Sequence, residues 1–517
     1  MEESRTKNTI RNMKTGMVVQ VINKLMIFVV RTVFIKTLNS EYLGVNGLFT
    51  NILTILSFAE LGIGTAIIFN MYKPVAENDT EKIKSLMQLY KKAYDIIGVV
   101  VFVLGILVIP FMKYIVKDAP NIKENLNFIY ILFLCNTTVS YFFTYKKSII
   151  SANQKQSIIN NIDSICYFIK SIIEILVLIL TKNFILYLII GIIATAIENI
   201  IVAKKADKMY PYLKDKDVKR LKKSESKKIF DNVKSLVVYK FGGVIMNGTD
   251  NILISSLINV STAGLCSNYI MIINSIKIII VSALNGLTAS VGNLNAVASK
   301  EKKESIFYQI TFANYIIYSF CAVAFIILLN PFIRIWLGDN YVLEMAVSVT
   351  LAVSFFFEGL RNPGYTYRTT LGLFQKAKTT PYIAAVTNII LSIVLCKWFE
   401  VAGIFAATSI AQLVSYSWID PYLVHKYEFR TSVRKYFKKF AMYTIVFAVD
   451  IVMSIIVTNL IKFEGIIGLI LKAIVVCIIP NLINLLVYYR TEEFKELKIK
   501  ILDPLISKFT RKIKKIA

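Results

Sequence analysis

Residues that carry much of enzyme chemistry are scarce in this chain. Its 517 residues include a single histidine, His425, and six cysteines. The cysteines lie far apart, each in an apolar segment, and none has the spacing of a metal or disulfide site. One histidine in a predicted loop offers little acid–base chemistry near neutral pH. The composition therefore weakens a catalytic interpretation, and no metal site is expected.

Two other features of enzymes are also missing. The sequence has no glycine-rich phosphate-binding loop and no nucleotide-binding domain, so we do not expect the chain to hydrolyse ATP. The predicted outer loops are all short, whereas a membrane glycan polymerase or ligase would need a sizeable outer loop to hold its active site. The first fifteen residues are polar and basic, and no cleavable signal peptide is expected. We predict a protein that is not an enzyme and uses no cofactor.

Apolar residues are abundant instead. They make up 56% of the chain, and the mean hydropathy is +0.60, as is typical of polytopic membrane proteins. A membrane-spanning helix needs about 20 apolar residues. We therefore predict an all-α membrane protein with about fourteen spans, at 16–38, 43–69, 93–113, 126–145, 158–180, 183–203, 235–258, 263–290, 306–330, 341–360, 379–397, 401–424, 437–461 and 466–489.

Positive charge is divided unevenly among the predicted loops. The net charge is +27, and cytoplasmic loops of membrane proteins carry an excess of Lys and Arg. With the N-terminus inside, and with cations at the ends of spans counted with the loops that they adjoin, the cytoplasmic segments hold 46 basic residues, the outer loops 8 and the interiors of the spans 6. This division predicts that both termini are cytoplasmic. The longest connection, 204–234, has 12 basic and 5 acidic residues. We expect it to lie on anionic lipid, with a specific binding role as the alternative.

The chain repeats itself at an offset of about 220 residues. Asn39 aligns with Asn259 and Gly44 with Gly264, and further matches follow at an offset of 221. Spans one to six and seven to twelve are therefore predicted to be two copies. Because six is even, both copies enter the membrane in the same direction, which gives two parallel six-helix lobes. The predicted domains are an N-lobe (1–203), a linker (204–234), a C-lobe (235–424), an added helix pair (425–490) and a basic tail (491–517).

Several predicted spans carry cations with no acid at helical spacing. Lys24 and Arg31 lie in the first span, two turns apart and so on one face, while spans seven and eight add Lys240 and Lys277. A cation at the bilayer centre costs at least about 2.5–3.5 kcal/mol. We therefore expect these four side chains to line a hydrated cavity that binds an anionic ligand, such as a phosphate group. The alternative is structural, with the cations snorkelling to the interfaces or pairing with nearby acids.

Other polar side chains of the spans have different predicted roles. Lys170 and Glu174 are four residues apart and predict a structural ion pair. Glu60, in the helix end SFAELGIG, is expected to cap or pair there, or to gate a cavity. Asp250 and Asn388 are candidate oxygen ligands for a sodium ion. Nothing in their spacing identifies the ion, so Na⁺ and H⁺ both stay open as coupling ions.

Five runs of the sequence resemble a known family of transporters. They are LGVNGLF (43–49), LSFAELGIGTAIIFNMYKP (56–74), GTDNILISSLI (248–258), GLCSNYIMI (264–272) and SVGNL (290–294). They resemble bacterial polysaccharide transporters, the oligosaccharide flippases of the multidrug/oligosaccharidyl-lipid/polysaccharide (MOP) exporter superfamily. The resemblance covers roughly the whole chain. It implies a V-shaped, MATE-like pair of six-helix lobes, and flipping of an undecaprenyl-diphosphate-linked repeat unit from the cytoplasmic to the outer leaflet.

The resemblance also bears on individual helices. In the related lipid II flippases, cationic residues of the first and eighth helices bind the diphosphate. Lys24, Arg31 and Lys277 lie in the corresponding helices of this sequence. Spans thirteen and fourteen resemble the extra helix pair thought to hold the lipid tail in those flippases.

The expected function is therefore transport of a lipid-linked oligosaccharide for surface polysaccharide synthesis, by alternating access in a bacterial inner membrane. Expected partners are this substrate, membrane lipid, and a glycan polymerase and other polysaccharide-assembly proteins, but no nucleic acid. Three alternatives stay open: a cation-coupled multidrug or metabolite antiporter of the same fold, a lipid II flippase, and a membrane glycan polymerase. An antiporter for cationic drugs would need an acidic cavity, whereas the predicted cavity is basic. The identity of the glycan and the oligomeric state stay open as well.

Overall fold

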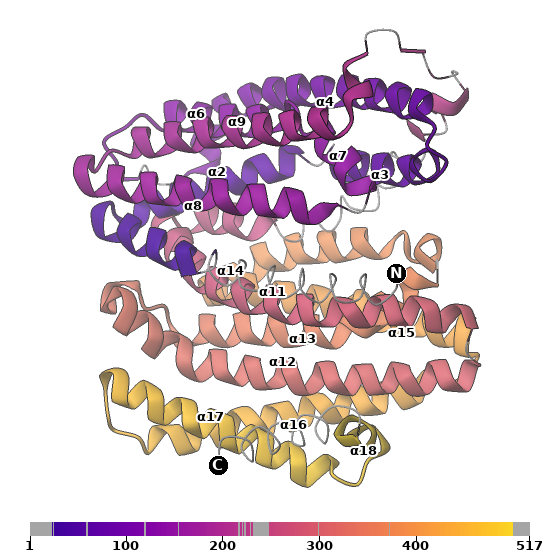
Figure 1. Cartoon of the computed structure of the whole chain (residues 1–517). Helices are drawn as coiled ribbons and strands as arrows, with labels where there is room; N and C mark the ends of the chain where they lie inside the picture. The colour runs from indigo at the N-terminus through magenta and orange to yellow at the C-terminus, as the bar shows by residue number, and fades with distance from the viewer. Residues whose placement is uncertain are drawn as a thin grey trace, which may run out of the picture. The chain divides into compact units, whose positions relative to one another are not determined.

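The computed structural model describes residues 23, 25–57, 60–117, 120–153, 155–215, 218–219, 221, 224–227, 229–230, 248–297, 299–371 and 373–499. Among these residues the regular secondary structure is helical throughout and includes no strand (Figure 1). The predicted all-α fold is confirmed.

The structure divides into two compact units, Met1–Gly264 and Leu265–Ala517. The first contains α2 (Ser40–Leu56), α3 (Glu60–Ala76), α4 (Thr80–Val108), α5 (Met112–Ile115), α6 (Leu126–Tyr141), α7 (Tyr145–Ala152), α8 (Gln156–Thr181) and α9 (Phe184–Met209). Helix α11 (Val260–Val297) begins in the first unit and continues in the second. The second unit adds α12 (Lys300–Leu337), α13 (Met345–Thr370), α14 (Thr380–Val414), α15 (Tyr416–Val424), α16 (Arg434–Asn459), α17 (Gly465–Tyr488) and α18 (Glu492–Leu497). The predicted domain boundaries stay predictions.

Four helices of the first unit begin at a capping side chain. Asn39 precedes α2, Asp79 precedes α4, Asn125 precedes α6 and Asn183 precedes α9. Each of these side chains accepts a hydrogen bond from a backbone N–H of the first turn, which stabilises a helix by about 1 kcal/mol. In the assembled unit, α6 packs between α4 and α9, and α8 packs on α9 (Figure 1). Local capping thus fixes where these helices start, and packing then arranges them around a polar interior.

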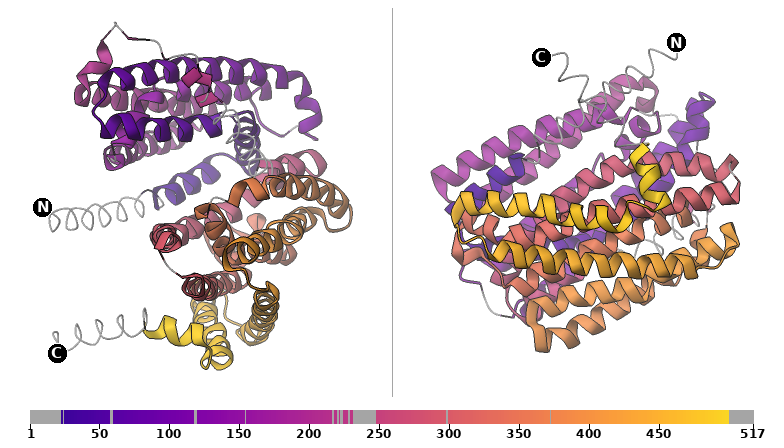
Figure 2. Two further views of the ribbon diagram at one scale, coloured as in Figure 1. Left: turned by 90° about the vertical axis from the view of Figure 1, so that its right-hand side faces the viewer. Right: turned by 90° about the horizontal axis from the view of Figure 1, so that it is seen from below.

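In the second unit, a chain of polar contacts ties the last two long helices to α12. Helices α16 and α17 lie side by side (Figure 2). The hydroxyl of Tyr315 on α12 donates to Asn484 Oδ1 of α17 at 2.6 Å, and Asn484 Nδ2 donates to Asp450 Oδ2 of α16 at 2.9 Å. All three residues are buried. Such bonds hold the helix pair because apolar contact alone gives little driving force between helices in lipid.

Eight helical segments of the described chain are long and apolar enough to cross a membrane, or nine if the bent pair α6–α7 counts as one span. They are Thr80–Ile115, Gln156–Thr181, Phe184–Met209, Val260–Val281, Lys300–Leu337, Thr380–Phe429, Arg434–Asn459 and Gly465–Tyr488. The most apolar window of Gln156–Thr181 is only 17% buried within the protein, as expected for side chains that face lipid. The chain is a multi-pass membrane protein, and the count of fourteen spans stays a prediction.

One of these segments contains two of the predicted spans. Within α14 the backbone leaves the helical conformation at Glu400 (φ 46°, ψ −127°). A Cβ on Gly403 would lie 2.3 Å from the carbonyl oxygen of Leu395. Residues eight apart in a straight helix are about 12 Å apart along the axis, so this close approach requires the chain to fold back. The segment is a hairpin whose two arms match the predicted spans 379–397 and 401–424.

Residues matched by the internal repeat have the same roles in the structure. Asn39 caps α2, and its counterpart Asn259 accepts a hydrogen bond from the backbone N–H of Thr262 at the start of α11. The starts of α2 and α11 also cross in close contact. A Cβ on Gly44 would lie 1.9 Å from the carbonyl oxygen of Val260, and the counterpart Gly264 approaches the backbone of α2 as closely. The repeat therefore conserves both a helix cap and a glycine crossing.

The described part of the 204–234 connection contacts α4 through its acids. Lys82 Nζ lies 2.5 Å from Glu225 Oε2, and Lys84 Nζ lies 3.2 Å from Asp215 Oδ2. The hydroxyl of Ser85 donates to the carbonyl of Lys219 at 2.6 Å. This connection is thus attached to the first turns of α4, and its contact with lipid stays a prediction.

Candidate functional site

Four helices of the first unit, α2, α6, α8 and α9, line a polar cavity of about 510 Å³ together with Glu60 of α3. This volume is in the range of small-molecule sites. The hydrogen-bonding side chains of the cavity, apart from its charged residues, are Asn46, Thr50, Thr54, Ser57, Asn136, Thr137, Ser140, Tyr141, Tyr187 and Thr195.

Four threonine and serine hydroxyls of the wall, those of Thr54, Ser57, Ser140 and Thr195, are anchored to backbone carbonyls of the preceding turn. Thr54 Oγ1 donates to the carbonyl of Thr50 at 2.7 Å, and Thr195 Oγ1 donates to the carbonyl of Gly191 at 2.9 Å. This bond satisfies the hydroxyl proton where bulk water is absent, and it leaves the oxygen lone pairs free to accept. The wall is therefore suited to a hydrated ligand, or to one rich in hydroxyl groups.

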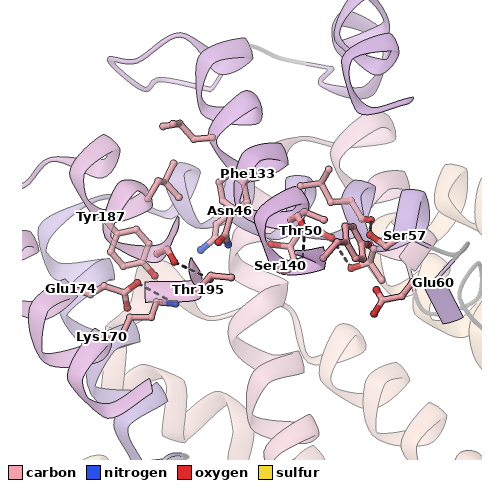
Figure 3. Close-up of a pocket in the computed structure, with 18 residues that line it drawn as sticks. Asn46, Thr50, Ser57, Glu60, Phe133, Ser140, Lys170, Glu174, Tyr187 and Thr195 are labelled. Atoms are coloured by element: carbon pink, nitrogen blue, oxygen red, sulfur yellow. Dashed lines mark hydrogen bonds and ion pairs between the residues drawn. The ribbon is translucent and has the colours of Figure 1, made fainter. Parts of the chain in front are cut away.

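Charged side chains occupy both ends of the cavity. Lys170 Nζ lies 3.4 Å from Glu174 Oε1, which confirms the ion pair predicted from their spacing. Figure 3 shows this pair at one end, beside Tyr187, and Glu60 at the other end. Glu60 is the first residue of α3, where a carboxylate is favourable because of the helix dipole. The predicted capping and gating roles of Glu60 are both compatible with this position.

Arg31 lies next to the same end of the cavity. It lines a smaller recess of about 160 Å³ that shares Asn46, Lys170, Glu174 and Tyr187 with the main cavity. Arg31, Lys170 and Glu174 thus lie around the same recess. The predicted ligand-binding role of Arg31 stays a prediction. The other first-helix candidate, Lys24, lies outside the described residues, and so does Lys240.

Lys277, the fourth predicted cation, has an acidic partner in the second unit. Its Nζ lies 2.5 Å from Glu358 Oε1 and 2.7 Å from Glu358 Oε2. Lys277 therefore has the acidic partner that the structural alternative expects, and its predicted role in substrate binding stays a prediction. Helical spacing could not identify the pair because Lys277 lies on α11 and Glu358 lies on α13, 81 residues later.

Helix α13 carries a charged stripe that the sequence analysis missed. The tenth span was predicted to end at residue 360, but α13 continues to Thr370. Glu358, Arg361, Tyr365 and Arg368 follow at helical spacing and so lie on one face. Arg368 Nε lies 2.9 Å from Asp420 Oδ1 of α15, and these side chains are 1% and 0% exposed. The helical spacing of these residues could have indicated the charged face. It was missed because the first arginine, Arg361, was taken to lie beyond the end of the span.

The two candidate sodium ligands belong to different units. Asp250 lies in the first unit and Asn388 in the second. Asn388 is fully buried, and its Nδ2 donates to Thr408 Oγ1 at 2.8 Å, a contact that joins the two arms of the α14 hairpin. A structural role for Asn388 is thus established, and the sodium site stays a prediction.

No family model matches the sequence, and neither does any curated protein. Solved structures do resemble this fold. One is lipid II flippase MurJ in an inward closed conformation, with a TM-score of 0.62 and 15% identity over 92% of this chain and 99% of that chain. Another is the inward-facing conformation of a multidrug resistance MATE family transporter of the MOP superfamily, with a TM-score of 0.59 and 14% identity over 78% of this chain and 96% of that chain.

At such low identity the resemblance concerns the fold rather than the substrate. The match extends over most of this chain and nearly all of both neighbours. Together with the apolar helices, it confirms the MATE-like architecture predicted from the sequence. The chain therefore has the all-α membrane fold found in transporters of the MOP superfamily.

Proposed function

We propose that the protein is a flippase that moves an undecaprenyl-diphosphate-linked oligosaccharide from the cytoplasmic to the outer leaflet by alternating access. The observation that carries the proposal is the similarity to a lipid II flippase over 92% of this chain. The multidrug transporter is matched over 96% of its own length, yet it accounts for only 78% of this chain. Part of this chain thus has a counterpart in the lipid flippase and none in the multidrug transporter.

The physical task of such a flippase agrees with the polar interior of the first unit. A diphosphate and its sugars cannot enter hydrocarbon, because removing their hydration is prohibitive. A hydrated cavity lowers this cost, while the polyprenyl tail stays in lipid. The hydroxyl and amide groups of the cavity match the hydroxyls of a sugar. The cations Arg31 and Lys170, which line the recess at one end, can attract an anionic group.

The protein is proposed to act in a bacterial inner membrane with both termini in the cytoplasm. The support is the distribution of basic residues, 46 in the segments assigned to the cytoplasm and 8 in the outer loops. Its substrate would come from enzymes that assemble the lipid-linked unit inside. A glycan polymerase and other polysaccharide-assembly proteins would act on the product outside.

The test is neutralisation of the first-helix cations. Lys24→Gln and Arg31→Gln are each scored for surface glycan and for protein level in the membrane. Loss of glycan at normal protein level is expected if these side chains meet the diphosphate. Lys36→Gln is the matched control, since Lys36 is an exposed cation of the same helix. Normal glycan in both variants would contradict the role of the first helix.

A cation-coupled multidrug antiporter is the second candidate. It is favoured by one observation, the two carboxylates Glu60 and Glu174 that line the cavity. An antiporter predicts that expression lowers drug accumulation in cells, and that Glu60→Gln abolishes this effect. A lipid II flippase, the third candidate, predicts rescue of cells that lack their own lipid II flippase.

A further inference from the structure

Arg361 differs from three other cations of the described helices, Lys170, Lys277 and Arg368. Lys170, Lys277 and Arg368 each lie within 4.0 Å of a carboxylate. In the described part of the chain, Arg361 has no carboxylate within this distance. Its guanidinium carbon instead lies 3.9 Å from the ring centre of Tyr416 on α15 and 5.7 Å from that of Tyr365. The guanidinium is therefore held by aromatic faces rather than by an acid.

The position of Arg361 in α13 makes this arrangement costly without a polar partner. The helix has 26 residues, Met345–Thr370. At 1.5 Å per residue, Arg361 lies only about 5 Å from its midpoint. The Nε atom is buried and has no hydrogen-bond partner among the described residues. An arginine at this depth faces water or an anion rather than lipid.

The charges around Arg361 leave an excess of one cation, because the single carboxylate of Asp420 interacts electrostatically with both Arg368 and Arg361. Lys277 is neutralised by Glu358, one turn before Arg361, and Asp420 is engaged with Arg368. The five charged side chains together carry a net charge of +1. The stripe thus offers a single positive site between two ion pairs.

The chemistry of a stacked guanidinium identifies the class of ligand. Stacking on a ring fixes the guanidinium plane and leaves its N–H edge free for bidentate bonds to a phosphate. Tyr365, the second aromatic neighbour of this guanidinium, is 37% exposed, so the surroundings of Arg361 are open on that side. We propose that Arg361 binds the diphosphate of the lipid-linked substrate, with Tyr416 and Tyr365 orienting its guanidinium. This inference rests on the proposed function and adds a binding residue that the sequence analysis had placed in a loop.

The test measures binding of undecaprenyl diphosphate to the purified full chain in detergent. Arg361→Gln is expected to weaken binding by about 10-fold or more, as for loss of a charge-assisted bidentate contact. Arg361→Lys keeps the charge but loses the planar fork, so its binding is expected to be intermediate. Arg334→Gln is the matched control, because this arginine is 59% exposed and pairs with Asp339 at the end of α12. Inorganic pyrophosphate is expected to compete with the lipid.

Each other outcome is decisive. Equal binding by Arg361→Gln and the wild type would overturn the role of Arg361 and leave the proposed function standing. No binding by the wild type would overturn both. If Arg361→Gln lost binding to phosphatidylglycerol vesicles as strongly as it loses binding to undecaprenyl diphosphate, Arg361 would contact lipid headgroups in general. The same would follow if pyrophosphate did not compete with the lipid. Either result would overturn diphosphate recognition. If Arg361→Gln fails to fold, Arg361→Lys and Tyr416→Leu provide the test, and unchanged binding in both would overturn the proposal.

Discussion

The ion pair in the cavity of the first unit and the two pairs around α13 in the second unit differ in how far along the chain they reach. In the first unit, Lys170 and Glu174 are neighbours on α8, and they line a cavity. In the second unit, Lys277 pairs with Glu358 across 81 residues, and Arg368 of α13 pairs with Asp420 of α15. The local pair adds charge to a cavity wall without joining two helices. The distant pairs join separate helices, so we expect them to contribute more to tertiary stability.

The largest effect is expected at the pair that is most deeply buried. Arg368→Gln leaves the carboxylate of Asp420 buried without its partner, which costs about 3–5 kcal/mol of unfolding free energy. We expect loss of protein from the membrane and a much lower melting temperature in detergent. The control is the double variant Arg368→Met with Asp420→Leu, which removes both charges and should recover most of the stability. A single variant as stable as the wild type would contradict the structural role of this pair.

An intermediate effect is expected at Lys277 and Glu358, whose side chains are 30% and 29% exposed. Partial exposure lets water screen the pair, so breaking it should cost only about 1 kcal/mol. Lys277→Glu places two acids together and should lower protein level, and adding Glu358→Lys should restore it. Transport by this reversed pair separates two roles, because a purely structural pair tolerates reversal. If the substrate needs a lysine at position 277, the reversed pair should not support transport. Failure of the double variant to recover protein level would argue against the pair itself.

The smallest effect on stability is expected at the local pair. Glu174→Gln removes an interaction within one helix, and such pairs contribute about 0.2–0.5 kcal/mol. The melting temperature should hardly change. Transport should change more, because the variant removes the carboxylate that pairs with Lys170 in the cavity wall. A large drop in stability with unchanged transport would contradict the contrast between this local pair and the pairs that join separate helices.

The sequence predicted the features that depend on local composition and spacing. Apolar runs of span length predicted the helices, and fold-back at Glu400 matches the boundary between two of them. The repeat aligned Asn39 with Asn259, and in the structure each accepts a hydrogen bond from a backbone N–H at the start of the helix that follows. The Lys170–Glu174 pair was predictable from its spacing, since four residues in a helix bring side chains together.

Tertiary structure decided the features that depend on which helices meet. No spacing rule connects Lys277 with Glu358 or Arg368 with Asp420, because their contacts arise only when separate helices pack. The continuation of α13 past residue 360 was hidden as well. An arginine in hydrocarbon is costly by itself, so the first arginine looked like the end of the span. Packing against Tyr416 and Asp420 lowers that cost, and only the folded chain shows these partners. The sequence by itself thus determined the helices and the charges that they carry, while the packing of helices decided which charges are neutralised and which stay available to a ligand.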